Sequence, residues 1–315
     1  MIAVTVAQVT PVNELVTRFR FVRSDGAALP AFSGGAHVVV GMDDRGLRRL
    51  NPYSLMSDPA DTSGYEISVR RDDAGRGGSL FLHRHVHPGQ QMQISHPVNL
   101  FPLDLRAKKH LMIAGGIGIT PFLAQTAQLA ADGGRFELHY AARNEALASY
   151  GTELRARFGE RVHQYYDDRG EAIALARLLA GQPLGTHLYV CGPKPMILWV
   201  RNAAAAAGWP NSVVHHEEFL APPPGAPFEV TLAASGRTIR VGAQQSLLEA
   251  IEAVGVDAPY LCRGGACGHC ETEVLACDGA IAHNDHYLTD AQKAAGAQIM
   301  PWVSRFAGAR LVLNR

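Results

Sequence analysis

Four of the five cysteines lie close together near the C-terminus, in the stretch YLCRGGACGHCETEVLACDG. Cys262, Cys267 and Cys270 have the spacing C-x4-C-x2-C, which is typical of plant-type [2Fe–2S] clusters. A loop around two irons needs conformationally free residues whose amides can donate to the cluster sulfurs. The residues of this kind are Gly264, Gly265, Ala266 and Gly268. Zinc knuckles usually add a second close pair of ligands, so the pattern favours an iron–sulfur cluster over zinc.

The segments around this loop predict a small α+β domain over 228–315. Two strands, FEVTLAA and RTIRVG, precede a helix, SLLEAIEAVG. Ser246 and Glu249 have the spacing of a capping box at the start of that helix. The preceding segment, LAPPPGAP at 220–227, predicts a stiff, extended linker.

Residues 104–221 predict a parallel, doubly wound sheet. Buried strands such as KHLMIAGG alternate there with helical patterns such as TPFLAQTAQLAADG.

A glycine-rich turn joins that strand to that helix. Gly115, Gly116 and Gly118 let the backbone approach a pyrophosphate, whose charge the helix N-terminus favours. Thr120 and Pro121 lie at the start of the helix. Since the turn departs from a strict G-x-G-x-x-G pattern, it indicates by itself only a candidate dinucleotide site.

Residues 1–103 are dominated by short alternating runs, among them IAVTVAQV, RFRFV, AHVVVGM and YEISVRR. Gly, Pro and Asp separate these runs at a spacing that predicts a small antiparallel β-barrel or sandwich. Towards the end of this block, Gly77, Gly78 and Ser79 open a predicted helix. The free amides and positive end of such a helix can bind an anion.

The composition excludes several classes of function. The 29 Lys and Arg residues balance the 29 Asp and Glu residues, so charge gives no reason to expect binding to nucleic acid or an anionic membrane. No run of 18 apolar residues is present, and the alternating N-terminus does not resemble a leader peptide. Clustered thiols are typical of metal or redox chemistry in a reducing cytoplasm. We expect a cytoplasmic, monomeric protein whose 315 residues form two or three domains.

Over essentially its full length, the chain resembles the phthalate dioxygenase reductase family, because its motifs occur in the family's order. The resemblance implies a flavin-binding antiparallel β-barrel at 1–103, a nicotinamide-binding α/β domain with a doubly wound parallel sheet at 104–221, and an α+β β-grasp ferredoxin domain at 228–315. It also implies an NADH-dependent oxidoreductase. Electrons would pass from NADH through FMN and a [2Fe–2S] cluster to a separate Rieske-type oxygenase, which hydroxylates or demethylates an aromatic or amine substrate.

The stretch NPYSLMS resembles the family's flavin motif, Arg-x-Tyr-Ser. The resemblance implies that Tyr53 lies against the isoalloxazine ring and that Ser54 hydrogen-bonds to N5 or O4. Asn51 stands where the family has arginine, so one contact is weakened or is moved to Arg48 or Arg49. The other predicted FMN contacts, to the ring edge and the phosphate, are Val69, Arg70, Gly77, Gly78 and Ser79.

Together with YVCGPKPM, the glycine turn resembles the nicotinamide domain of ferredoxin–NADP reductases. The resemblance implies that Cys191 and Gly192, followed by Pro193, line the approach of the nicotinamide ring to the flavin. Cys191 is equally compatible with a buried core thiol. Phe219, at the end of HHEEF, is expected near the flavin. The predicted catalytic residues are therefore Ser54 and Cys191, and family habit favours NADH over NADPH.

One position departs from the family. Its members carry a fourth cysteine just before a Val-Ser-Arg, whereas this chain has Trp302 in IMPWVSRFAG. An indole carries only an N–H donor and cannot ligate iron. Cys277 is the candidate fourth ligand, and the alternatives are a histidine, a water molecule, or a labile or absent cluster. Cys277 is also compatible with a small buried hydrophobe.

Two rival functions stay open. One is an NAD(P)H:flavin reductase whose ferredoxin domain has a defective or atypical cluster, and the other is a non-catalytic redox sensor. Bound iron distinguishes an electron-transfer reductase from a flavin reductase with a defective cluster. Rapid NADH-dependent reduction of an acceptor counts against a non-catalytic redox sensor.

Overall fold

The computed structural model describes residues 1–44 and 46–315. Their contacts divide the chain into two compact units. Unit 1 comprises Met1–Met42, Tyr53–Asp73 and Gly77–Phe219, and unit 2 comprises Asp43–Pro52, Ala74–Arg76 and Leu220–Arg315. The predicted domain limits, 1–103, 104–221 and 228–315, stay predictions.

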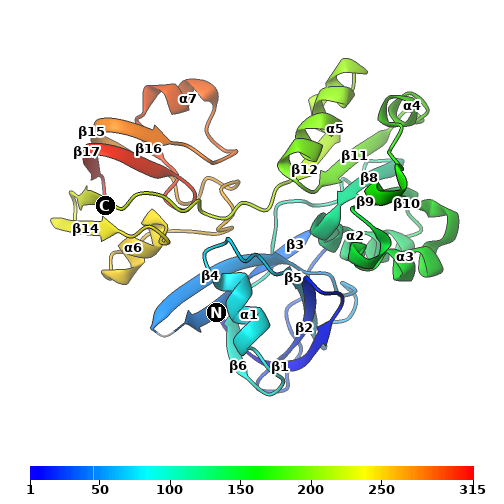
Figure 1. The fold of residues 1–315 in the computed structure, drawn as a ribbon, viewed down its shortest axis with the longest axis horizontal. Coiled ribbons are helices and arrows are strands. Elements are labelled where there is room, and N and C mark those ends of the chain that lie inside the picture. The colour runs from blue at the N-terminus through cyan, green and yellow to red at the C-terminus, as the bar shows by residue number, and fades with distance from the viewer. Residues whose placement is uncertain (45) are drawn as a thin grey trace. The chain divides into compact units, whose positions relative to one another are not determined.

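The first sheet consists, in the described residues, of seven strands that curl into a nearly closed antiparallel barrel (Figure 1). Its order is β4-β3-β6-β1-β2-β5, with β7 paired to β3. Because side chains alternate along a strand, Val4 and Val6 of β1 and Phe19 of β2 all point into the core and are fully buried. The elements are β1 (Ile2–Pro11), β2 (Val16–Arg23), β3 (Ala36–Asp44), β4 (Leu47–Ser54), β5 (Tyr65–Arg70), α1 (Gly78–His85), β6 (Gln91–Ile94) and β7 (Val98–Asn99).

The second sheet is parallel throughout, in the order β10-β9-β8-β11-β12. Parallel sheets are covered on both faces, which explains why residues 110–115 of the central strand β8 are all buried. The elements are β8 (Lys109–Gly115), η1 (Gly116–Ile119), α2 (Thr120–Ala131), β9 (Phe136–Ala142), η2 (Glu145–Leu147), α3 (Gly151–Phe158), η3 (Gly159–Arg161), β10 (Val162–Tyr166), η4 (Asp167–Arg169), α4 (Leu175–Ala180), β11 (Thr186–Cys191), α5 (Lys194–Ala206), η5 (Asn211–Val213) and β12 (Val214–Glu217).

The sheet of unit 2 has the order β14-β13-β17-β15-β16, and β13 pairs in parallel with β17. Helix α6 packs Leu247, Leu248 and Ile251 into the core of this unit. The predicted capping box is confirmed, because Ser246 Oγ accepts from the Glu249 amide at 3.1 Å and Glu249 Oε2 accepts from the Ser246 amide at 2.8 Å. The elements are β13 (Phe228–Leu232), β14 (Arg237–Val241), α6 (Leu247–Ala253), β15 (Thr272–Ala282), α7 (Asp290–Ala295), β16 (Gln298–Ile299) and β17 (Arg305–Leu313).

The predicted fold class is confirmed, since the barrel, the parallel sheet and the α+β sheet with its helices are all present. Within the described residues, every helix is too short or too polar to span a bilayer.

Replacement of Ser246 by alanine removes a hydrogen-bond acceptor at the start of α6. We expect the free energy of unfolding of unit 2 to fall by about 1 kcal/mol. Chemical denaturation measures this loss in a Trp199→Phe/Trp209→Phe background, where the fluorescence of the buried Trp302 reports on unit 2. Ser235→Ala, whose hydroxyl hydrogen bonds are 3.4 Å long, is the matched control. An equal loss in both serine variants would contradict the capping role.

Candidate functional site

The predicted flavin residues lie on β4, β5 and the start of α1. Tyr53 and Val69 belong to one apolar cluster together with Phe81 of α1, and Ser54 is 6% exposed. His83 of α1 contacts the Val69 carbonyl oxygen through Nε2 at 2.8 Å, which holds the helix against β5. The structure therefore brings together flavin motifs that are distant in the sequence.

The start of α1 fits an anionic group. Gly77 precedes the helix with a φ of 99°, a conformation that favours glycine. The first turn of α1 has neither a side-chain cap nor an acidic residue, so its first amides are left for a ligand. Ser79 Oγ accepts from the Asp72 amide at 3.1 Å and so ties the helix start to the segment after β5. With the positive helix end, this arrangement fits a flavin phosphate.

Two further predicted flavin residues are not part of the apolar cluster that contains Tyr53 and Val69. Arg70 is exposed at the end of β5, and Asn51 is half-buried on β4. Their roles stay predictions.

The glycine turn packs directly on the end of β11. A Cβ at Gly118 would lie 2.4 Å from the Cys191 carbonyl oxygen. At Gly115, it would lie 2.8 Å from Pro193 Cδ. Gly116 has a φ of 55° and open space where its side chain would be. The turn therefore approaches β11 closely and leaves free backbone beside it, which fits the pyrophosphate of a dinucleotide.

The residues on either side of this contact are also close together. A Cβ at Gly192 would lie 3.1 Å from Gly115 Cα. Thr120 and Pro121 begin α2 as predicted, and both are buried. Phe219 is 46% exposed at the end of unit 1.

A half-buried glutamate, with one carboxyl oxygen fully buried, lies next to Cys191. Strands β11 and β12 pair in parallel, with Cys191 opposite Glu217. Cys191 has no exposed surface, and burial raises the pKa of its thiol. In the described structure, Glu217 Oε2 is buried without a hydrogen-bond partner, and burial raises the pKa of this carboxyl to about 8. Glu217 has no predicted role, although its place in HHEEF, at the end of a predicted strand, is a signal that could have singled it out.

The cysteines at 262, 267 and 270 lie in one irregular loop between α6 and β15. The Gly264 amide donates to Cys262 Sγ at 3.2 Å, and the His269 amide donates to Cys267 Sγ at 3.5 Å. A hydrogen bond from the Cys267 thiol, followed by backbone amides, lowers the pKa of Cys262. Burial raises the pKa of Cys270. The loop therefore stabilises the thiolate, the form that ligates iron, at Cys262 but not at Cys270.

Glycine is required at two points of this loop. Gly268 has a φ of 75°, and a Cβ there would lie 2.2 Å from Tyr287 Cζ. Gly265 has a φ of 70°, and its Cβ would lie 3.0 Å from Val303 Cγ2. A larger residue at either position would force the loop away from its neighbours.

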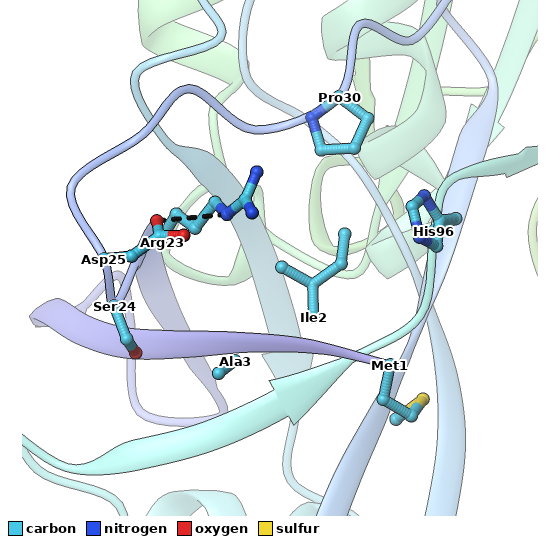
Figure 2. A pocket seen from close by; sticks show the side chains of 8 residues that line it. All are labelled: Met1, Ile2, Ala3, Arg23, Ser24, Asp25, Pro30 and His96. Carbon is cyan, nitrogen blue, oxygen red and sulfur yellow. Dashed lines mark ion pairs between the residues drawn. The ribbon is translucent and has the colours of Figure 1, made fainter.

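A cavity of about 480 Å³ lies elsewhere in unit 1 (Figure 2). Its lining residues are Met1, Ile2, Ala3, Arg23, Ser24, Asp25, Pro30 and His96. An ion pair between Arg23 and Asp25, with a separation of 3.0 Å, lies on one side of it. Since no predicted cofactor residue is in this lining, the cavity is not part of the candidate site.

Comparison with known proteins gives matches in both halves of the chain. Residues 94–214 match the family model for the dimethylamine monooxygenase subunit DmmA-like N-terminal domain, and residues 230–300 match the 2Fe-2S iron-sulfur cluster binding domain. The heme-dependent oxidative N-demethylase beta subunit of Ectopseudomonas mendocina is 44% identical, over 100% of this chain and 99% of that protein. The carnitine monooxygenase reductase subunit of Acinetobacter pittii is 45% identical, over 98% and 99%.

Among solved structures, phthalate dioxygenase reductase is similar over 99% of this chain and 97% of its own, with 34% identity and a TM-score of 0.89. It is described as a modular structure for electron transfer from pyridine nucleotides to [2Fe-2S]. The chain belongs to the phthalate dioxygenase reductase family. This reductase is an oxidoreductase with the flavin- and nucleotide-binding architecture of that family and a ferredoxin-type domain.

Trp302 is the residue at which the family resemblance predicts a fourth cysteine. The Trp302 amide donates to Cys270, which places residue 302 beside the cysteine loop. The indole is 1% exposed, and its Nε1 is buried without a partner among the described residues. The donor set thus fits a [2Fe–2S] cluster at three of its four ligand positions, because an indole supplies no ligand.

Cys277 lies on β15, opposite Leu311, and its side chain is exposed. Its Sγ donates to the Gly279 carbonyl oxygen at 3.7 Å. The interpretation of Cys277 as a buried hydrophobe is therefore wrong, because β15 directs this side chain to solvent. The role of Cys277 as fourth ligand stays a prediction. Its position does not favour this role, because its described contacts are with its own strand and with β17.

The raised pKa of Glu217 predicts that stability falls as the pH rises. The folded chain keeps the Glu217 proton up to about pH 8, whereas the unfolded carboxyl loses it near its ordinary value of 4.5. Folding therefore binds a proton between these values. The free energy of unfolding should fall by at most about 1.4 kcal/mol per pH unit over this interval.

Glu217→Gln should remove this fall, as measured by chemical denaturation at several pH values across the interval. Glu218→Gln, which removes a neighbouring carboxyl, is the matched control. A Glu217→Gln variant that keeps the wild-type slope would show that the buried carboxyl is not the cause.

Proposed function

We propose that the reductase oxidises NADH and passes the electrons through FMN and a [2Fe–2S] cluster, one at a time, to a separate Rieske-type oxygenase. The packing of the glycine turn against Cys191 carries this proposal, because it leaves free backbone that a pyrophosphate could approach, next to the Cys191 thiol and the Glu217 carboxyl. The names of the relatives support it, since one is the reductase subunit of a carnitine monooxygenase.

The flavin side of the site is built from apolar surface and free amides. A bound flavin would accept an electron pair from NADH and release single electrons. Tyr53 and Val69 would face its ring, and Ser54 would hydrogen-bond to the ring edge. The first turn of α1, from Gly77 onwards, would hold the phosphate. FMN is proposed over FAD because the α1 amides offer a place for one terminal phosphate.

The nucleotide side is built from the two backbone segments in contact. The turn at 115–118 would hold the pyrophosphate, while Cys191 and Gly192 would leave room for the nicotinamide ring. Glu217 holds a proton beside Cys191 and can donate a hydrogen bond in its neutral form. Phe219, which is exposed, would cover the ring.

The names of two relatives point to different kinds of oxidising partner. One is named for carnitine monooxygenase, whereas another is named as the beta subunit of a heme-dependent oxidative N-demethylase. Carnitine carries an N-methylated ammonium group and N-demethylation removes an N-methyl group, so we propose an N-methylated nitrogen compound as the substrate class of the partner of this reductase. Its monomeric state and its cytoplasmic location stay predictions.

Trp302 favours a second candidate function, an NAD(P)H:flavin reductase with an incomplete cluster. The ring packs in the same apolar core as Cys270, and an indole supplies no ligand to iron. In this case electrons would leave from the flavin without passing through unit 2.

The purified reductase is expected to be yellow, to release FMN on denaturation, and to lose flavin absorbance when NADH is added without oxygen. Gly118→Ala should lower kcat/KM for NADH by on the order of a hundredfold, as a misplacement of about 1 Å can. Gly181→Ala is the matched control, because its Cβ would meet its nearest atom at an ordinary 3.4 Å. A colourless protein, or bound FAD, would refute the flavin assignment, and preference for NADPH would refute NADH.

Iron and sulfide analysis separates the two candidate functions. An electron-transfer reductase should contain about two irons per chain, and Cys270→Ser should lose them. Cys277→Ser should keep the wild-type content, because Cys277 is exposed on β15. Trp302→Cys should raise the content if the natural site is incomplete. Iron-free wild-type protein would favour the flavin reductase, and loss of iron in Cys277→Ser would establish Cys277 as a ligand.

A further inference from the structure

A second group of metal-ligating side chains lies in unit 1, on the adjacent strands β9 and β10 (Figure 1). Glu137 and His139 are two residues apart on β9 and therefore share one face of the sheet. His163 of β10 is the direct neighbour of His139 in the parallel register. The two imidazole rings are stacked, with centroids 4.6 Å apart and an angle of 15° between their planes.

The donor atoms of these three residues converge. His139 Nε2 lies 3.0 Å from Glu137 Oε1, and His163 Nε2 lies 3.5 Å from the same oxygen. One donor atom of each residue lies within 4.8 Å of the other two. Tetrahedral Zn²⁺, with bonds of about 2.0–2.1 Å, holds its ligand atoms about 3.3 Å apart. The two nitrogen-to-oxygen separations, 3.0 Å and 3.5 Å, lie just below and just above that value.

A neighbouring tyrosine can orient one of these rings. Tyr165 Oη lies 2.8 Å from His139 Nδ1, so it can accept a hydrogen bond from Nδ1–H while Nε2 ligates an ion. Carboxylate oxygens and imidazole nitrogens are the donors that Zn²⁺ takes.

A cavity of about 380 Å³ opens beside this group, lined in part by Glu137, His139 and Tyr165. The His163 side chain is 39% exposed, so an ion can enter from solvent. Lys109 Nζ contacts Glu137 Oε2 at 2.6 Å, which leaves Oε1 for the ion but also places a positive charge nearby.

We propose that Glu137, His139 and His163 form a binding site for Zn²⁺ or a similar divalent transition-metal ion, with a fourth coordination position open to the cavity. The ion would cross-link β9 and β10. The site is independent of the flavin, nucleotide and cysteine sites.

A third group, formed by Asp104, His187 and His215, is a weaker candidate for binding the same ion. Arg106 donates to both carboxylate oxygens of Asp104, through Nε at 2.9 Å and Nη2 at 2.6 Å. This pairing neutralises the charge that would attract the metal, so the group serves as an internal control.

Equilibrium dialysis of the full-length protein against Zn²⁺, followed by metal analysis, tests the proposal. We expect wild type to bind one more ion per chain than His139→Gln/His163→Gln, and His187→Gln/His215→Gln to bind as many as wild type. All three proteins keep the cysteines, so zinc on thiols cancels from the difference. Equal numbers for wild type and the first variant would overturn the proposal.

Two further measurements separate metal binding from a folding defect. Zn²⁺ should raise the Tm of wild type by more than that of His139→Gln/His163→Gln, because zinc on the thiols is common to both proteins and only wild type binds the additional ion in its folded state. Lys109→Gln keeps all three ligands and removes the nearby charge, so it should bind Zn²⁺ several-fold more tightly than wild type. An unchanged or weaker affinity in Lys109→Gln would contradict the proposed geometry.

Discussion

The approach of two backbones at Gly118 sets the geometry of the nucleotide end of the parallel sheet. With 2.4 Å between a Cβ position and the Cys191 carbonyl oxygen, even one methyl group would force the turn off β11. The position of Cys191 in turn determines where Glu217 lies, because β12 pairs with β11 at that residue. The thiol, the carboxyl and the free backbone at Gly116 therefore have a common origin in a contact that involves no side chain.

Features that depend on a few neighbouring residues could be predicted from the sequence. The alternation of the barrel strands, the capping box at Ser246 and the glycine turn are of this kind, because propensity and spacing carry the information. Glu217 could not be assigned in the same way. Its raised pKa results from burial beside Cys191, and the register of two strands separated by a helix decides that burial.

The group of Glu137, His139 and His163 shows the same limit. The spacing of Glu137 and His139 predicts a shared face as soon as β9 is recognised as a strand. Their convergence with His163 requires the parallel register of β9 and β10, which a single sequence does not contain. By contrast, the cysteine loop could be recognised directly, because the three thiols and the glycines between them lie within a few residues.

Trp302 shows how a ferredoxin-type core can form without a fourth thiolate. Arg263, within the cysteine loop, is fully buried and pairs with Glu252. Its guanidinium lies 3.8 Å from the ring centre of Tyr260 and 5.1 Å from that of Trp302. Such cation–π contacts are worth about 0.5–2 kcal/mol each, the larger values applying where the groups are desolvated.

A thiolate at position 302 would have offered this cation a full negative charge. The indole offers the negative face of its ring instead, and it also packs into the core that contains Cys270. The buried charge of Arg263 is thus compensated by Glu252 and two aromatic rings, whether or not a metal centre is bound. The core of unit 2 therefore has packing at residue 302 that does not depend on a ligand bond to iron.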